Sequence, residues 1–244
     1  MSTHDYIAAR RLLAGAASAV LLLAAWPAQA QWLGQDYATY GVPMSNFIQL
    51  ATVHNLNMID AATPGDKKSA SAAAAAPAPL RAEAPPAVQR NAQELAQRFP
   101  AAQRAPMAQA YQDSMEVYQK IEAKMGWSRN DVGGAIAAFV VGNYMAMRDT
   151  EVADEDFAAV ARQMRNHPRL AGSFKQQSAA SLRNLYEQSA MVGTFMALAQ
   201  KSLQQAPQPT QQANLRAAAR ENLKLVLGAD PERLRISARG AVLE

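Results

Sequence analysis

Asn143 and Tyr144 are the residues of this sequence that are the first candidates for a ligand-binding role. They lie in a run, residues 132–147, that carries no charged side chain. A polar amide in such a run is expected to be buried, and a buried amide must find hydrogen-bonding partners. We therefore predict Asn143 and Tyr144 as ligand-binding residues, which form a polar anchor in a pocket between helices. The alternative is a hydrogen bond that fixes the register of this helix against its neighbours.

Acidic side chains are densest over residues 149–156. The members of this cluster are Asp149, Glu151, Asp154, Glu155 and Asp156. Hard cations such as calcium and magnesium prefer oxygen ligands, so the cluster could hold one. However, the EF-hand spacing and its central glycine are absent, and acids at the start of a helix are stabilised by the helix dipole without a metal. We therefore predict no metal site.

Other residues with catalytic chemistry are sparse. Glu187 could be the lone general acid of a cell-wall hydrolase, but such an enzyme needs a second group or a substrate groove. Glu187 instead flanks an apolar stripe, which favours a solvated glutamate. His54 and His167 are far apart in the sequence, and the methionines, although potential copper(I) ligands, are common fillers of helical cores. We predict no catalytic residue and no cofactor.

Composition excludes several further classes of protein. The chain has no cysteine, which excludes disulfides, thiolate metal sites and cysteine nucleophiles. Its 24 Lys and Arg residues against 20 Asp and Glu residues give a net charge of +4. The two signs are interspersed, whereas a nucleic-acid-binding protein shows a clustered basic face. We therefore expect no nucleic-acid partner.

The N-terminal segment has the pattern of a secretory signal peptide. Arg10 and Arg11 precede an uncharged apolar run, residues 12–26, and Ala28-Gln29-Ala30 supplies the cleavage site. The apolar run is shorter than the ~20 residues that a membrane-spanning helix requires. We predict that residues 1–30 are removed and that the protein is exported to the periplasm or the exterior, with no stable membrane span after cleavage.

Two segments of different character follow the predicted signal peptide. Residues 31–60 are rich in aromatic and aliphatic side chains, and their periodicity does not decide between a short helix and a strand. Residues 61–103 are dominated by alanine and proline, with few side chains to bury. Because such a segment cannot offset the entropy of ordering, we predict that it is a disordered or extended linker, with no more order than one or two frayed helical turns over Asn91 to Phe99.

Residues 104–244 have the periodicity of an all-α domain, a compact bundle of about five helices. Apolar residues recur at intervals of three and four in the successive segments 104–125, 132–147, 154–167, 179–204 and 215–227. Gly126 and Gly228 are placed to end helices, and Asp230 followed by Pro231 begins a further turn. Residues 234–237 are expected to be an extended tail.

Two of these helices are predicted to form the centre of the bundle. Residues 132–147 and 188–200 lack charges altogether. We expect their uncharged faces to pack on each other, with Gly142 and Gly193 at the points of closest approach. A glycine inside a helix costs ~1 kcal/mol of helix propensity, and close approach of two backbones offsets that cost.

Several motifs of the C-terminal part resemble an exported bacterial family that is known only as a domain of unknown function. They are Leu185-Tyr186-Glu187, the stretch 193–198, and the stretch 219–236 with Asn222, Gly228 and Pro231. The resemblance covers about residues 105–240. It implies an all-α fold, and it brings no catalytic residues with it.

Three classes of function are compatible with these observations. The leading expectation is a non-enzymatic helical module that binds another protein of the bacterial envelope or exterior. The second is a carrier of a small apolar or lipidic ligand, and the third is a cell-wall hydrolase. A large cavity favours the carrier, a cleft with two converging acids favours the hydrolase, and a solid core favours the interaction module.

Overall fold

The computed structural model describes residues 80–244, except for the side chains of residues 168, 169 and 171. The predicted signal peptide (1–30), the segment 31–60 and the linker up to residue 79 lie outside the described residues. The predictions made for these segments therefore stay predictions.

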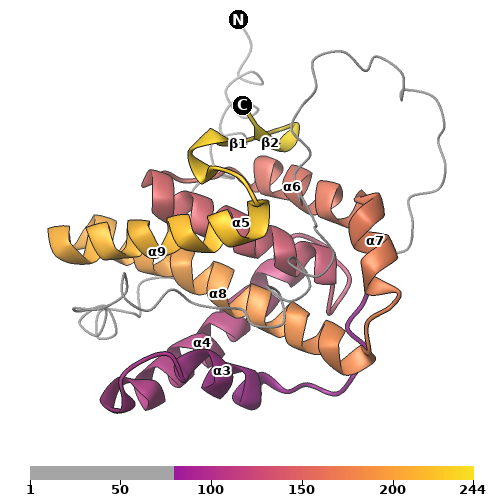
Figure 1. The fold of residues 1–244 in the computed structure, drawn as a ribbon, viewed down its shortest axis with the longest axis horizontal. Helices are drawn as coiled ribbons and strands as arrows, with labels where there is room; N and C mark the ends of the chain where they lie inside the picture. Colours follow the sequence, from indigo (N-terminus) through magenta and orange to yellow (C-terminus); the bar gives the residue numbers. More distant parts are fainter. Residues whose placement is uncertain (1–79) are drawn as a thin grey trace, which may run out of the picture. The chain divides into compact units, whose positions relative to one another are not determined.

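The described residues form seven α-helices, one short 3-10 helix and one β-hairpin (Figure 1). In chain order these elements are α3 (Val88–Ala96), α4 (Ala101–Lys124), α5 (Val132–Arg148), α6 (Asp154–Asn166), α7 (Pro168–Phe174), α8 (Ala179–Gln205), α9 (Pro209–Leu227), η2 (Pro231–Arg233), β1 (Leu234–Ser237) and β2 (Gly240–Leu243). The predicted all-α class is confirmed, with seven helices in place of about five. None of the described helices is both long and apolar enough to cross a membrane.

Local sequence signals explain where the helices begin and end. Asp131 caps α5 through a hydrogen bond from the Gly133 N–H to its carboxylate, 3.1 Å. Gly126 and Gly228 have φ angles of 67° and 61° just beyond α4 and α9, a conformation that side chains other than glycine adopt at a cost. The predicted stops at these two glycines and the cap at Asp230 before Pro231 are confirmed.

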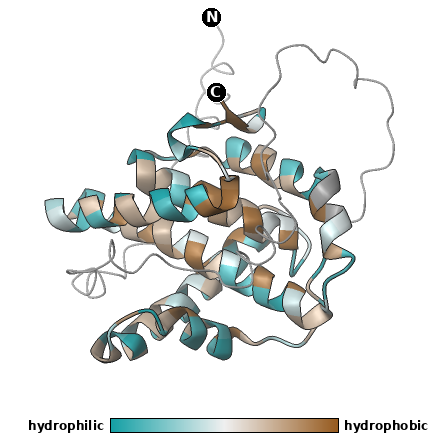
Figure 2. Cartoon of the chain, viewed as in Figure 1, coloured by the Kyte–Doolittle hydropathy of each residue, from teal (hydrophilic) through white to brown (hydrophobic). Residues whose placement is uncertain are grey.

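The predicted central pair of helices is also confirmed. The most extensive helix contact is between α5 and α8. A Cβ atom added to Gly142 would lie 1.9 Å from the Gly193 carbonyl oxygen, and one added to Gly193 would lie 2.2 Å from the Ala138 carbonyl oxygen. The two backbones therefore touch where glycine leaves room. Figure 2 shows apolar residues along α5, in keeping with its near-complete burial.

Aromatic side chains join α4 to α8. The rings of Tyr111 and Phe195 lie 5.2 Å apart between centroids, and those of Tyr118 and Tyr186 lie 5.9 Å apart edge to face. Such arrangements contribute ~0.5–1.5 kcal/mol beyond the area that they bury. Burial also raises the pKa of Tyr111 and Tyr118, because the ionised phenolate cannot be solvated there.

The prediction of a linker over residues 61–103 is wrong for its C-terminal part. Residues 88–96 form α3, which packs on α4, and Ala92 and Leu95 in it are buried. The alanines of α3, Ala92 and Ala96, are both buried. The helical part therefore begins upstream of Arg104, and the predicted domain boundary at that residue falls within α4.

The C-terminal tail is a β-hairpin instead of a single extended segment. β1 and β2 pair antiparallel, with Leu234 opposite Leu243 and Ile236 opposite Ala241. Both strands contact α6, and Leu234, Ala241 and Leu243 are buried. The sequence pattern identified the extended conformation of 234–237 but not its partner strand, because residues 240–243 form a short apolar run with no alternation.

Candidate functional site

The amide of Asn143 is engaged by protein groups. Its Nδ2 donates to the Phe139 carbonyl at 2.8 Å, and its Oδ1 accepts from Asn222 Nδ2 at 2.9 Å. Asn143 is fully buried and connects α5 to α9, which matches the register-fixing alternative. Tyr144 is half-buried at the next position of α5. Neither residue lines the pocket beside Asp149 described next, and their ligand-binding role stays a prediction.

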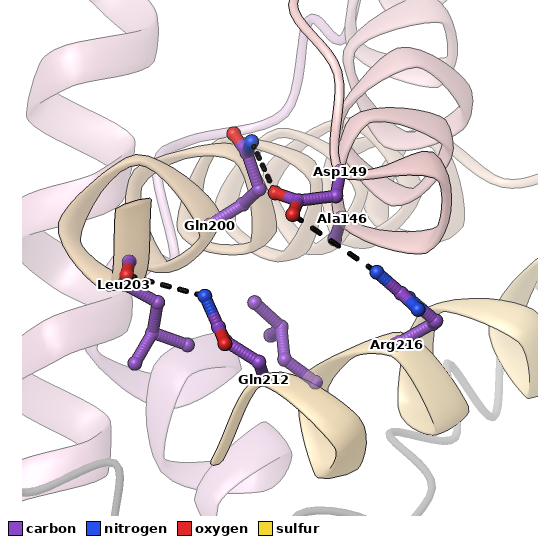
Figure 3. Close-up of a pocket in the computed structure, with 7 residues that line it drawn as sticks. Ala146, Asp149, Gln200, Leu203, Gln212 and Arg216 are labelled. Carbon is purple, nitrogen blue, oxygen red and sulfur yellow. Dashed lines mark hydrogen bonds and ion pairs between the residues drawn. The ribbon is translucent and has the colours of Figure 1, made fainter. Parts of the chain in front are cut away.

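A small pocket of mixed polar and apolar lining lies one helical turn further along α5 (Figure 3). Its walls come from the end of α5, the C-terminal half of α8 and the first half of α9. The lining residues are Ala146, Asp149, Gln200, Leu203, Gln212, Leu215 and Arg216. The enclosed space accommodates little more than a single water molecule, so the pocket suits a bound solvent molecule and not a carried ligand.

Asp149 organises the polar side of this pocket. It ends α5 in a left-handed conformation, with φ of 53°. Its carboxylate accepts from Gln200 Nε2 at 3.2 Å and from Gln204 Nε2 at 3.1 Å, and it lies 4.0 Å from the Arg216 guanidinium. Figure 3 shows the Gln200 and Arg216 side chains reaching Asp149 from α8 and α9. The first acid of the predicted cluster thus closes a helix junction.

The other acids of the cluster point to separate partners. Glu151 pairs with Lys201 at 3.3 Å and Asp154 with Lys124 at 2.7 Å, while exposed Glu155 and half-buried Asp156 lie in the first turn of α6. Among the described residues, no group of three or more histidine, aspartate or glutamate side chains converges as a metal site would require. The side chains therefore act as ion-pair partners and as favourable charges at the start of a helix.

His167 lies at the junction of α6 and α7. Its Nδ1 accepts a hydrogen bond from the Leu170 N–H at 3.4 Å, so the imidazole caps the start of α7. This imidazole contact serves the helix that follows.

The densest buried polar cluster lies elsewhere, at the first half of α8. Glu187 is fully buried there, and its carboxylate accepts from the Ala87 N–H at 3.0 Å and from Asn91 Nδ2 at 2.6 Å. Arg183 lies one turn away with its Nη1 3.8 Å from Glu187. The interpretation of Glu187 as a solvated glutamate is therefore wrong, because the chain upstream of α3 covers it.

Arg183 binds this upstream chain, which we call the strap and define as residues 80–87. Its guanidinium donates to the carbonyl oxygens of Ala82 and Ala84, the latter at 2.7 Å, and to Asn130 Oδ1 at 3.1 Å. Backbone hydrogen bonds of 3.0 Å join the Ala82 N–H to the Asn130 carbonyl and the Val132 N–H to the Leu80 carbonyl. The strap is thus held from α8 and from the loop before α5.

Glu122 extends the buried cluster from α4. Its carboxylate accepts from the N–H groups of Asn130 and Asp131, at 3.3 and 3.0 Å, and from the Tyr186 hydroxyl at 3.3 Å. Burial raises the pKa of Glu122, although the two backbone hydrogen bonds work in the opposite direction. Asp131 in turn accepts from Arg165 at 2.7 Å, and that guanidinium stacks over the Trp127 ring.

The buried polar cluster holds chain segments in place, and protein groups enclose its carboxylates. Glu122, Asp131 and Glu187 are each at most 4% exposed, and each is bonded to protein donors. A general acid must be accessible to its substrate, and protein groups enclose these three side chains. A signal for the cluster was present in the sequence, since Arg183 and Glu187 are four residues apart on one face of α8, but only the fold reveals the strap that they bind.

The fold and this cluster together define a helical-bundle protein with a charge-anchored N-terminal strap and a C-terminal β-hairpin. The chain belongs to a family of unknown function, DUF6683, which matches residues 8–244. Comparison with curated proteins and with solved structures gave no match.

Proposed function

We propose that this protein is an exported, non-enzymatic helical module that binds another protein in the bacterial envelope or exterior. The proposal rests on the hydrogen bonds that the buried carboxylates make within the chain. Glu122, Asp131 and Glu187, the enclosed acids of the described residues, are all bonded to backbone or side-chain donors of the chain itself. Their bonds hold the strap and the loop before α5, so residues on the protein surface are the ones that recognise the partner protein.

The alternatives have less support. A carrier of an apolar or lipidic ligand needs a cavity that encloses most of the ligand, typically ~300–1,000 Å³. The pocket beside Asp149 holds about one water molecule, and the interface of α5 with α8 is closed by backbone contact at Gly142. A cell-wall hydrolase needs an acid that faces its substrate, and Glu187, the candidate for that role, is buried under the strap.

Export and the envelope location rest on the N-terminal pattern. Arg10, Arg11, the apolar run 12–26 and Ala28-Gln29-Ala30 are the observations in favour. N-terminal sequencing of protein released from the cell should begin at Gln31. A released protein that still begins at Met1 would contradict cleavage.

The proposed function is tested on protein purified from its native host after in-cell crosslinking. Native mass spectrometry should find a stoichiometric protein partner and no retained small molecule. A co-purifying lipid or other apolar compound would support the carrier instead. The same preparation should release no soluble fragments from purified cell-wall peptidoglycan, and release that is lost in Glu187→Gln would support the hydrolase.

A further inference from the structure

One edge of the C-terminal hairpin is closed by a side chain. The amide of Gln163, from α6, bonds both main-chain groups of Ala241 in β2. Its Nε2 donates to the Ala241 carbonyl at 2.8 Å, and its Oε1 accepts from the Ala241 N–H at 2.8 Å. Gln163 thus occupies the place that a third strand would take. Exposed strand edges invite pairing with other chains, and covering an edge is one way in which proteins prevent it.

The opposite edge, along β1, is open at Ile236. In an antiparallel pair, residues alternate between those that bond across the pair and those whose N–H and C=O point outward. Because both groups of Ala241 point outward to Gln163, the same holds for its partner Ile236 on the other side. Within residues 80–244, no hydrogen bond reaches the Ile236 N–H or C=O.

The neighbouring outward position on β1 is only lightly covered. The Leu234 N–H bonds the Pro231 carbonyl in η2. The Leu234 carbonyl accepts from Arg235 Nη1 at 2.9 Å, and the same nitrogen donates to the Glu232 carbonyl at 2.8 Å. This arginine is exposed, and its Nε lies 3.6 Å from the Glu244 carboxylate. An acidic side chain that drew Arg235 away would free the Leu234 carbonyl for a strand that is already bonded to Ile236.

We propose that β1 is a strand-addition site that binds an extended segment of a partner protein in which apolar and acidic residues alternate. The alternation follows from the two faces of β1. Ile236 lies on the same face as the buried Leu234 and is half-exposed, so an apolar residue beside it completes the cover over α6. Arg235 projects from the other face, and exposed Arg233 and Arg239 flank the strand, so acidic residues complement that face.

This inference rests on the proposed function, because it names the surface and the chemistry of the protein partner. Main-chain bonds to Ile236 supply binding that depends little on sequence, and the side chains on the two faces supply the selectivity. Edge pairing of this kind also explains why one edge is blocked by Gln163 while the other carries arginines in place of a cover.

The direct test uses protein purified from cells that express the full chain. Three synthetic peptides are titrated into this protein. The first peptide alternates valine and glutamate, the second alternates valine and lysine, and the third has the composition of the first in two blocks. NMR titration should show the first peptide shifting the amide of Ile236 and slowing its hydrogen exchange. The other two should bind at least tenfold more weakly. Equal binding of all three, or no change at Ile236, overturns the proposal.

Two variants separate loss of the edge from loss of the fold. Ile236→Pro removes the outward N–H, which has no internal partner, and proline is tolerated at such edge positions. It should weaken the first peptide at least tenfold. Ile236→Val keeps the N–H and should stay within twofold of the parent. If Ile236→Pro unfolds the hairpin, Arg235→Glu serves as the second test. This variant should bind the valine–glutamate peptide more weakly than the parent does and the valine–lysine peptide more tightly.

The remaining outcomes distinguish this inference from the proposed function. A crosslinked partner that is retained equally by the parent and by Ile236→Pro leaves the proposed function standing and overturns the edge site. Protection of the Ile236 amide that grows with protein concentration identifies a second copy of the chain as the occupant and overturns the proposal. Protection that vanishes when residues 31–79 are deleted does the same, because the occupant is then a segment of this chain.

Discussion

At the scale of single residues, the backbone contact between α5 and α8 depends on the absence of two side chains. Gly142 and Gly193 allow the backbones of α5 and α8 to touch, because a Cβ atom on either would overlap a carbonyl group of the facing helix. A flexible side chain can move aside, but two helix backbones cannot without disturbing the packing around them. Glycine at these positions is therefore a requirement of the packing.

Gly142→Ala should destabilise the protein by ~3 kcal/mol, since one added methyl group forces the central helices apart. Urea unfolding monitored by circular dichroism measures the change. Gly172→Ala is the matched control, because no heavy atom lies within 4 Å of the Cβ position on this glycine of α7. It should be neutral or stabilising by up to ~1 kcal/mol. Equal unfolding midpoints for the two variants would contradict the close contact of α5 and α8.

At the scale of elements, the strap is attached to α8 through charges, while α3 also packs buried apolar residues on α4. Arg183 and Glu187 present opposite charges to the carbonyl and N–H groups of residues 82–87, groups that would otherwise be buried without partners. Removing one partner of a buried ion pair typically costs ~3–5 kcal/mol, because the other charge is left uncompensated. The attachment of this segment should therefore depend on few side chains.

Arg183→Met should detach the strap and α3 while the central helices persist. Hydrogen exchange should show loss of protection over residues 80–96, with the amides of α5 still protected. Limited proteolysis of the variant should cut first in the same segment. Arg162→Met replaces an exposed arginine of α6 and should change the stability by less than ~0.5 kcal/mol. Uniform loss of protection across α3 and α5 would show that the strap does not open on its own.

The same elements show how far the sequence predicts this fold. The long helices and the contact at Gly142 follow from local periodicity and from the absence of charge, which are properties of neighbouring residues. The burial of Glu187 and the order of α3 depend on contacts almost a hundred positions apart, such as that between Asn91 and Glu187. No local pattern encodes such pairs. The pairing of β1 with β2 was missed for a different reason, because a four-residue apolar strand has too few positions to show a period.

At the scale of the whole molecule, burial of titratable groups ties stability to pH. Burial raises the pKa of Tyr111, Tyr118 and Tyr186, so the folded chain keeps these phenols protonated where the unfolded chain ionises them. The stability that they contribute is fully present below their ordinary pKa of 10.0 and is lost as the pH rises through the folded-state values. Burial also raises the pKa of Glu122 from its ordinary value of 4.5, so the stability that Glu122 contributes is lost as the pH rises above that value.

Tyr111→Phe should therefore shift alkaline unfolding to higher pH. The Tyr111 hydroxyl is fully buried, and within residues 80–244 it has no hydrogen-bond partner, so its removal should be neutral or stabilising at pH 7. Above pH 10 the variant lacks one ionising group, and its free energy of unfolding should fall less steeply by ~1.4 kcal/mol per pH unit. Urea unfolding at a series of pH values measures both effects. Tyr186→Phe is the contrasting variant, because it removes a hydroxyl that donates to Glu122 and should already be destabilised at pH 7. If the free energy of unfolding of Tyr111→Phe falls as steeply above pH 10 as that of the parent, the buried phenol of Tyr111 does not govern alkaline unfolding.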